Sequence, residues 1–262
     1  MKPVTLITGA SAGIGAELAR VFARHNHELV LVARREDKLT ALAAEIAAAG
    51  APRPTVLSID LTRRDAVSTL AAELAARGLE PEIVVNNAGF GLVGRAARLG
   101  RDEQLAMIDL NVRALTELSL TFVDSLARHR GGILNVASVA AFMPGPGMAV
   151  YYASKAYVLS LSEALHQEFG RRGIRVTALC PGPVPTEFQQ RAGLRDERSQ
   201  LALVSLSAER VAQIGYDGFM RGRRVVVAGF GNRVAVSLSR IMPKALLLAL
   251  MYFGTRWAER RS

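Results

Sequence analysis

Cysteine, histidine and lysine are scarce in this sequence, and their scarcity excludes several classes of protein. Among 262 residues there is one cysteine, Cys180, so no disulfide can form within the chain. This count fits a reducing compartment, and we expect a cytoplasmic location. The four histidines form no HExxH motif and no Cys/His cluster, so no metal site is expected.

Basic residues outnumber acidic ones, and the excess is almost entirely arginine. The formal net charge is +10, yet only four of the 33 basic residues are lysines. The arginines are scattered along the chain, whereas a nucleic-acid-binding protein usually concentrates them on one face or stripe. We therefore expect no nucleic-acid partner. A solvated basic surface can still assist an anionic cofactor or substrate.

Long apolar runs are also missing. The stretch 4–7 is too short for the apolar region of a secretory signal and runs directly into glycines, which favours a first strand. The apolar run 245–253 has nine residues, whereas a transmembrane helix needs about 20. No membrane-spanning segment is expected.

Seven short apolar runs alternate with longer helical stretches. The runs are continuous and mostly β-branched, as in parallel strands that are buried on both faces. They lie at 4–7, 28–32, 55–59, 83–85, 132–136, 175–179 and 224–227, with clear helical stretches at 36–49 and 63–77. This alternation predicts an α/β fold, a single-domain Rossmann-type doubly wound parallel β-sheet over residues 1–262 with helices on both faces.

A glycine-rich turn follows the first predicted strand and precedes a helix. Its spacing is GxxxGxG rather than the GxGxxG of the general dinucleotide fingerprint. Glycines allow a tight turn and a close approach of the backbone to a pyrophosphate, and the helix presents free N–H groups to it. Glycines also make ordinary strand–helix turns. We assign cofactor binding to Gly9, Ser11, Gly13, Ile14 and Gly15.

The end of the second predicted strand indicates which cofactor is bound. An acidic residue at this point binds the adenosine ribose 2′-hydroxyl, whereas an arginine nearby accommodates a 2′-phosphate. Here no acid stands at the strand end, and Arg34 and Arg35 follow it. A guanidinium can bind a phosphate through several donors. This favours NADP(H); the alternative is that both arginines are only surface charges.

Several separated motifs together resemble the classical short-chain dehydrogenase/reductase (SDR) family. The resemblance covers about residues 4–228, and the motifs stand in the order of the family. They are TGASAGIG at 8–15, Asp60, NNAG at 86–89, Asn111, Ser138, YYASK at 151–155 and PGPVPT at 181–186.

The resemblance adds further residues to the expected cofactor site. It implies that Asp60 contacts the adenine ring, for which a helix N-cap is the alternative, and that Thr186 touches the nicotinamide carboxamide. Asn86 is also expected at the cofactor, and Asn87 is expected to have a structural role as well. The cofactor residues so implied are Asp60, Leu61, Asn87, Ala88, Gly89, Tyr151, Lys155, Pro181, Gly182, Val184 and Thr186.

The expected chemistry involves Tyr151 and Lys155, which lie one helical turn apart and so share a face. Helix geometry also admits Tyr152, and the family pattern YxxxK selects Tyr151. A nearby ammonium should lower the pKa of the phenol. The resemblance makes Tyr151 the general acid, with Ser138 bonded to the same substrate oxygen and Asn111 holding a water of a proton relay. Taken singly, Ser138 is also compatible with a turn hydroxyl and Lys155 with a solvated helix charge.

These motifs predict an NADPH-dependent oxidoreductase that acts on a small-molecule carbonyl or secondary alcohol. A 3-oxoacyl thioester reductase, an NADP-using epimerase or dehydratase, and a catalytically silent NADPH-binding scaffold are the alternatives. The family also implies a homodimer or homotetramer, commonly formed through long helices at about 101–128 and 149–170.

Two segments have no counterpart among the motifs. The polar insertion 187–206 is placed to act as a substrate lid, with a helix packed on the domain as the alternative. The C-terminal extension 230–262 combines apolar and basic residues. Three interpretations stay open: it folds over the cleft to form an apolar substrate pocket, packs at a subunit interface, or lies on a membrane surface through 241–257.

Overall fold

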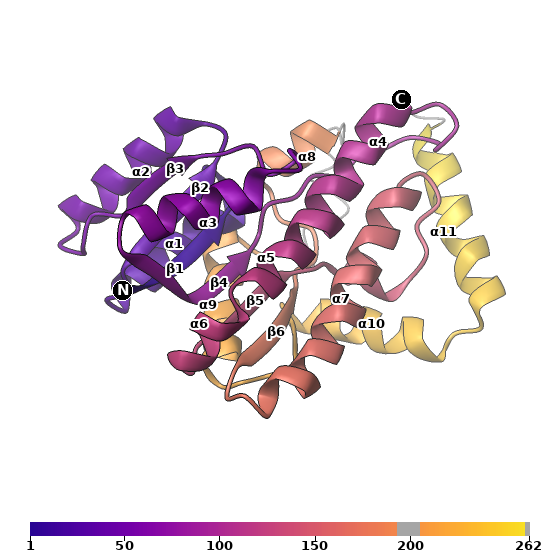
Figure 1. Cartoon of the computed structure of the whole chain (residues 1–262). Helices are drawn as coiled ribbons and strands as arrows, with labels where there is room; N and C mark the ends of the chain where they lie inside the picture. The colour runs from indigo at the N-terminus through magenta and orange to yellow at the C-terminus, as the bar shows by residue number, and fades with distance from the viewer. Residues whose placement is uncertain (193–204, 260–262) are drawn as a thin grey trace.

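Parallel strands form the centre of the structure, a computed structural model that describes residues 1–192 and 205–259 (Figure 1). One seven-stranded sheet has the order β3-β2-β1-β4-β5-β6-β7. The strands are β1 (Lys2–Thr8), β2 (Leu29–Ala33), β3 (Thr55–Ser58), β4 (Leu79–Asn86), β5 (Gly132–Val136), β6 (Arg175–Cys180) and β7 (Val225–Val227). The chain builds the sheet outward from β1 in one direction and from β4 in the other. This confirms the predicted doubly wound fold.

Helices cover both faces of the sheet, because each strand is apolar on both sides. On one face Phe22, Leu39 and Phe219 pack against strand residues such as Ile7 and Leu31. These helices are α1 (Gly13–Arg24), α2 (Glu36–Ala48) and α9 (Ala208–Met220). The other face is covered by α3 (Ala66–Ala76), α5 (Leu115–Thr121), α6 (Val123–Arg128) and α7 (Ala149–Gly170).

The helix predicted at 63–77 starts three residues late, at Ala66. A turn precedes it, in which the backbone N–H and the hydroxyl of Thr62 both donate to Asp60 Oδ1, at 3.0 and 2.8 Å. Asp60 therefore caps this turn and not the helix itself. The helix predicted at 36–49 ends at Ala48, before Gly50, whose φ of +90° suits the end of a helix.

The long helix expected at about 101–128 is interrupted. The structure divides it into α4 (Arg101–Ile108), a π-helical segment (Asp109–Ala114), α5 and α6. Asn111 lies in the π-helical segment and is almost fully buried. A π-helical turn widens the helix locally and often occurs at functional sites. The continuous-helix prediction was wrong here, while α7 is one unbroken helix from Ala149 to Gly170.

The C-terminal extension forms two further helices, α10 (Phe230–Ile241) and α11 (Lys244–Glu259). They lie beyond α7, at the side of the molecule opposite α2 and α3 (Figure 1). Within the described ranges, no helix has both the length and the apolar character needed to cross a membrane. Of the expected lid, α8 (Glu187–Ala192) and residues 205 and 206 are described, and 193–204 lie outside the described residues.

Candidate functional site

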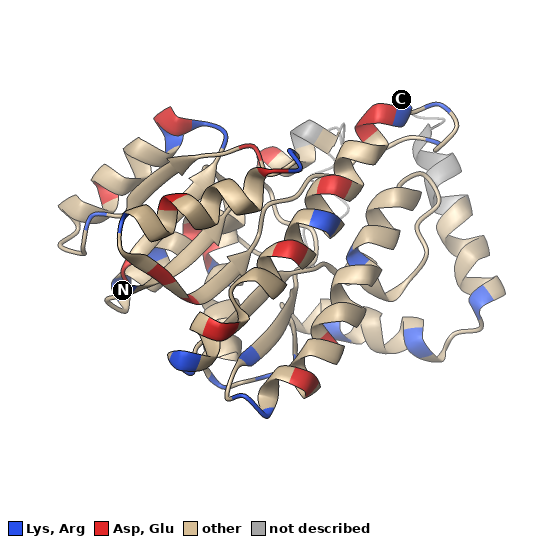
Figure 2. Ribbon diagram, in the orientation of Figure 1, with Lys and Arg blue, Asp and Glu red and all other residues tan. Residues whose placement is uncertain are grey.

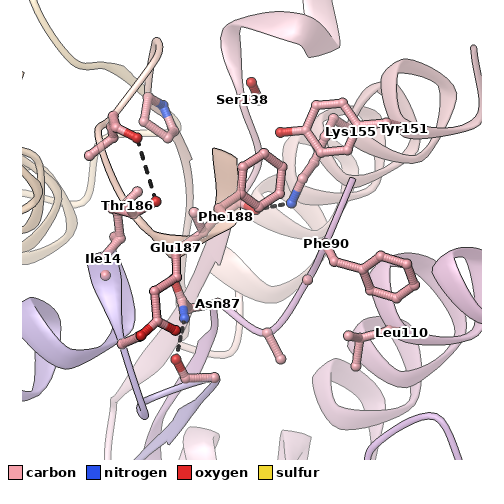
Figure 3. Close-up of a pocket in the computed structure, with 18 of the residues that line it drawn as sticks. Ile14, Asn87, Phe90, Leu110, Ser138, Tyr151, Lys155, Thr186, Glu187 and Phe188 are labelled. Atoms are coloured by element: carbon pink, nitrogen blue, oxygen red, sulfur yellow. Dashed lines mark hydrogen bonds between the residues drawn. The ribbon is translucent and has the colours of Figure 1, made fainter. Parts of the chain in front are cut away.

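A cavity of about 900 Å³ runs along the carboxyl ends of the strands. Ligands bind at this edge in doubly wound sheets, where the strand order reverses. Its lining includes every residue predicted for the cofactor except Gly15 and Asn86, and every residue predicted for catalysis except Asn111. Figure 3 shows the side chains of Asn87, Thr186, Ser138, Tyr151 and Lys155 around this space.

The turn after β1 has a backbone that only glycine suits. Gly9 has a φ of +66°, which side chains disfavour. A Cβ atom on Gly15 would lie 2.3 Å from both Asn87 Nδ2 and the carbonyl oxygen of Gly9. The Asn87 amide fastens this turn by donating to the carbonyl oxygens of Thr8 and Gly9, at 2.9 and 3.1 Å. The turn leads directly into the N-terminus of α1, so the residues fit a dinucleotide pyrophosphate.

Two arginines line the end of the cavity beyond β2. Arg35 Nη2 donates to Ser11 Oγ at 3.2 Å and to Glu187 Oε2 at 2.7 Å. Arg34 Nη1 lies 4.0 Å from Asp60 Oδ2. Both guanidinium groups are about half exposed. Since Ser11 belongs to the glycine-rich turn, the Arg35 guanidinium lies beside that turn.

The end of the cavity formed by β5 and α7 contains Ser138, Tyr151 and Lys155, which are predicted for catalysis. Ser138 follows β5, and its hydroxyl accepts a hydrogen bond from the Ala140 N–H at 3.1 Å. Lys155 Nζ lies 5.9 Å from the centroid of the Tyr151 ring and donates to the carbonyl oxygen of Val136 at 2.8 Å. Ser138 thus has a turn-forming bond as well as its place beside Tyr151 (Figure 3).

Tyr152 also lines the cavity, but its ring packs against Gly145 in the loop before α7. A Cβ atom on Gly145 would lie 2.3 Å from the Tyr152 ring, so the phenol is pressed against the loop before α7. Burial raises the pKa of both phenols, and a hydrogen bond with Ser138 opposes this rise for Tyr151 only. This difference groups Tyr151, and not Tyr152, with Ser138.

The expectation of a lowered phenol pKa was wrong for this structure. Burial raises the pKa of Tyr151 to about 12, and the hydrogen bond with Ser138 opposes this only in part. Burial also lowers the pKa of Lys155 to about 8. Both effects have one cause, because a site that excludes water disfavours charge on either group.

Two buried asparagines serve positions below the cavity. Asn86 does not line it: its Nδ2 donates to Ser119 Oγ at 3.0 Å and to Asn135 Oδ1 at 2.9 Å. The placement of Asn86 at the cofactor was therefore wrong, because its amide faces α5 and a side chain of the neighbouring strand. Asn111 holds the backbone of Phe90, accepting from its N–H at 3.1 Å and donating to its carbonyl at 2.9 Å. Its Nδ2 also donates to Ser154 Oγ at 3.1 Å.

Several lining residues have no motif that singles them out. The Phe188 ring lies 5.5 Å from the Tyr151 ring, and Phe90 and Met148 line the same end. Glu187 reaches the opposite end, at Arg35. Glu187 and Phe188 fall in the predicted lid, which was the only signal for them.

The C-terminal extension contributes nothing to this lining among its described residues. All described lining residues lie between Gly9 and Gln189. The hypothesis that the extension shapes an apolar substrate pocket is thus not supported by the described parts of α10 and α11. Metal-binding groups of three or more His, Cys, Asp or Glu side chains are likewise not found in the described part of the chain.

The sequence and the fold are similar to those of known oxidoreductases. The profile of the family described as short chain dehydrogenase matches residues 3–197. Sulfoacetaldehyde reductase 2 of Chromohalobacter salexigens is 35% identical over 224 residues, which cover 82% of this chain and 87% of the relative.

Two solved structures extend the similarity to the fold. A short-chain dehydrogenase from Sphingobium yanoikuyae in complex with NADPH is 33% identical, with a TM-score of 0.78 and coverage of 99% of this chain and 96% of that one. A homologue from Burkholderia phymatum in complex with NAD is 28% identical, with a TM-score of 0.78 and coverage of 90% and 92%.

Proposed function

Because the chain belongs to the short-chain dehydrogenase family, an oxidoreductase family, we propose that it is an NADPH-dependent reductase of carbonyl compounds that uses Tyr151 as general acid. The observation that carries the proposal is the joint placement of Ser138, Tyr151 and Lys155 at one end of a cavity whose other end has the glycine-rich turn. In the reverse direction the same residues would serve oxidation of a secondary alcohol.

The residues around the cavity fit a dinucleotide. Gly9, Gly13 and Ser11 would hold the pyrophosphate, and Arg34 and Arg35 a 2′-phosphate. Asp60 and Leu61 would flank the adenine, and Lys155 would reach the nicotinamide ribose. Similar structures hold either NADPH or NAD. We favour NADPH because β2 is followed by two arginines and by no carboxylate at its tip.

Reduction of a carbonyl requires a proton on the carbonyl oxygen. When bound, the reduced nicotinamide supplies hydride to the carbonyl carbon. Tyr151, with a pKa of about 12, holds its proton throughout the neutral range and can donate it to the developing alkoxide. The Ser138 hydroxyl would stabilise charge on the same oxygen. Lys155, with a pKa of about 8, is mostly charged at pH 7 and favours the phenolate that remains. The water relay through Asn111 stays a prediction.

The substrate class is proposed from the lining at the catalytic end. Phe90, Val139, Met148, Tyr152 and Phe188 present apolar or aromatic surface there. Apart from Lys155, the described lining residues at this end carry no charge. The arginines and Asp60 follow β2 and β3, and Glu187 pairs with Arg35. An uncharged, apolar ketone or aldehyde is therefore the expected substrate.

Oxidation of NADPH against a panel of carbonyl compounds tests the proposal. The panel contains cyclic and aromatic ketones, long-chain aldehydes, a 3-oxoacyl thioester and sulfoacetaldehyde, the compound in the name of the Chromohalobacter relative. We expect turnover with the apolar carbonyls. A preference for sulfoacetaldehyde would overturn the substrate class alone. Tight NADPH binding with no turnover on any compound would favour the scaffold alternative.

The remaining expectations accompany this proposal. A single domain over residues 1–262, a homodimer or homotetramer, and a cytoplasmic location stay predictions. The arrangement of α4 and α7, with exposed Leu105, Ile108 and Tyr157, is compatible with oligomer formation through the helices named from the sequence. Sedimentation velocity would measure the oligomeric state directly.

A further inference from the structure

Helix α10 carries an apolar stripe on its outward side. Four residues three or four positions apart share one helix face: Phe230, Val234, Leu238 and Ile241. Phe230 and Ile241 are each 80% exposed, and Leu238 is 52% exposed. The residues buried against the protein lie on the opposite side of the helix and are Asn232, Val236 and Ser239. A surface helix normally turns its polar side outward, so α10 is inverted.

Helix α11 adds further exposed apolar side chains on more than one of its sides. Leu246, Leu248 and Leu250 are exposed, while Leu247 is buried. The two helices meet at residues 242 and 243 and form the edge of the molecule beyond α7 (Figure 1). Exposed apolar side chains gathered on neighbouring helices are typical of an interaction site. The docking surface is defined here as Phe230, Val234, Leu238, Ile241, Leu246, Leu248 and Leu250.

All the charge on residues 230–252 is positive. Arg233, Arg240 and Lys244 lie on these helices, and the sequence from 230 to 252 contains no Asp or Glu. Figure 2 shows blue and no red along the coloured parts of α10 and α11. Arg240 lies over the Phe142 ring at 5.0 Å, and Arg233 Nε donates to the carbonyl oxygen of Val227 at 3.3 Å. Both guanidinium groups are therefore held at fixed places beside the apolar stripe.

This charge distribution disfavours a second copy of the chain as the occupant. A two-fold contact would bring the same surface of both copies together. The three basic residues of one copy would then face three basic residues of the other, with no acid on either helix to pair with them through residue 252. An occupant that offers both an apolar layer and negative charge removes this conflict.

We propose that the docking surface binds the surface of an anionic lipid bilayer. The apolar side chains would enter the boundary between headgroups and acyl chains, and the three basic residues would face lipid phosphates. The contact is peripheral, and it does not depend on the proposed reaction. Asn232 of α10 packs against Gly182, a cavity-lining residue, so docking would bring the cavity close to the lipid.

The test is sedimentation of the full-length protein with lipid vesicles. Vesicles of phosphatidylcholine mixed with phosphatidylglycerol are compared with vesicles of phosphatidylcholine alone. We expect at least about tenfold tighter binding to the anionic vesicles, weakened by added salt, since each basic residue near such a surface contributes about fivefold. The single tryptophan, Trp257, lies in the α11 sequence, and its emission should shift to shorter wavelength with anionic vesicles only.

Matched variants separate the apolar and the charged contributions. Leu238→Asp should weaken vesicle binding by about tenfold or more, because it removes one inserted side chain. Met220→Asp, on α9 and 39% exposed, should not. Lys244→Glu should weaken binding, whereas Arg171→Glu, with the same change in net charge but at the residue that follows α7, should not. Circular dichroism verifies that each variant is folded.

Three results would overturn the proposal. The first is equal or absent binding to the two kinds of vesicle. The second is an oligomer that Leu238→Asp dissociates while wild type fails to bind vesicles, which would make the docking surface a self-contact. The third is an equal loss of binding in Lys244→Glu and Arg171→Glu, which would reduce the effect to net charge.

Discussion

Arg35 and Glu187 form an ion pair across the mouth of the cavity, with 2.7 Å between Nη2 and Oε2, although 152 positions separate them in the sequence. The pair joins the end of β2 to α8. The same guanidinium donates to Ser11 in the glycine-rich turn. Glu187 thus binds the same guanidinium that the proposed 2′-phosphate would bind. The hydrogen bond from Arg35 lowers the pKa of the Glu187 carboxyl.

Replacing the carboxylate should strengthen NADPH binding. Glu187→Gln removes a negative charge that competes for Arg35, and exposed ion pairs are weak, so we expect the Kd for NADPH to fall by about two- to fivefold. The Kd for NADH should change less. Fluorescence titration measures both, with Glu73→Gln, which breaks a remote pair with Arg77, as the control. A weaker affinity for NADPH would mean instead that Glu187 holds Arg35 in its binding position.

Cofactor preference should depend on the two arginines after β2. Arg34→Ser and Arg35→Ser should each raise the KM for NADPH by about tenfold or more, because each removes charge-assisted hydrogen bonds to phosphate. The KM for NADH should hardly change. Arg53→Ser, at an exposed position before β3, is the control. Equal effects on both cofactors would show that these arginines do not distinguish the 2′-phosphate.

The two neighbouring phenols should differ sharply in turnover. Tyr151→Phe removes the proposed general acid, and kcat should fall by about 10²- to 10⁴-fold with NADPH binding retained. Tyr152→Phe should leave kcat nearly unchanged, because its ring packs at Gly145. Steady-state kinetics and NADPH titration together decide between them. If Tyr152→Phe were the inactive variant, the assignment based on Ser138 would fail.

The buried ammonium of Lys155 should destabilise the folded protein when no cofactor is bound. Burial lowers the pKa of Lys155 from 10.5 to about 8, a difference that corresponds to about 3 kcal/mol of unfolding free energy. Below pH 8 both states hold the proton, so the cost is fully present. Between pH 8 and 10.5 only the unfolded chain binds it, so the destabilising contribution of Lys155 diminishes as pH rises.

The matching variant is Lys155→Met, measured by urea unfolding without cofactor. At pH 7 it should be more stable than wild type by about 1–3 kcal/mol, since losing the bond to the Val136 carbonyl offsets part of the gain. This advantage should shrink as pH rises from 8 to 10.5. Lys38→Met, at an exposed position, should show no such trend. A variant less stable at pH 7 would mean that the ammonium is well solvated.

Local patterns predicted most of the sheet and the cavity. β5 runs from Gly132 to Val136 as expected, because its apolar run ends at clear turn residues. β4 begins at Leu79, earlier than the apolar run at 83–85, since pairing with β1 extends it through Glu80 and Pro81. Pairing with a distant strand is not visible in the residues of one strand.

Other features depend on contacts between distant residues and had no local signal. The π-helical segment places Asn111 against the backbone of Phe90, which belongs to a different part of the chain. The raised pKa of Tyr151 follows from burial, which spacing along a helix does not reveal. The outward apolar side of α10 is similar: the sequence showed an apolar and basic helix, and only the fold shows which side is covered.

The strand order has a consequence for synthesis on the ribosome. β1 pairs with β2 and also with β4, and the sheet then continues through β5 to β7. A nascent chain that ends before β5 holds the glycine-rich turn but lacks Ser138 and α7. Such a chain has only part of the binding site, so nucleotide should stabilise it less than it stabilises the whole protein. Most of the early stability should come from apolar packing of α1 to α3 on the first strands, and the full effect of ligand requires translation beyond β6.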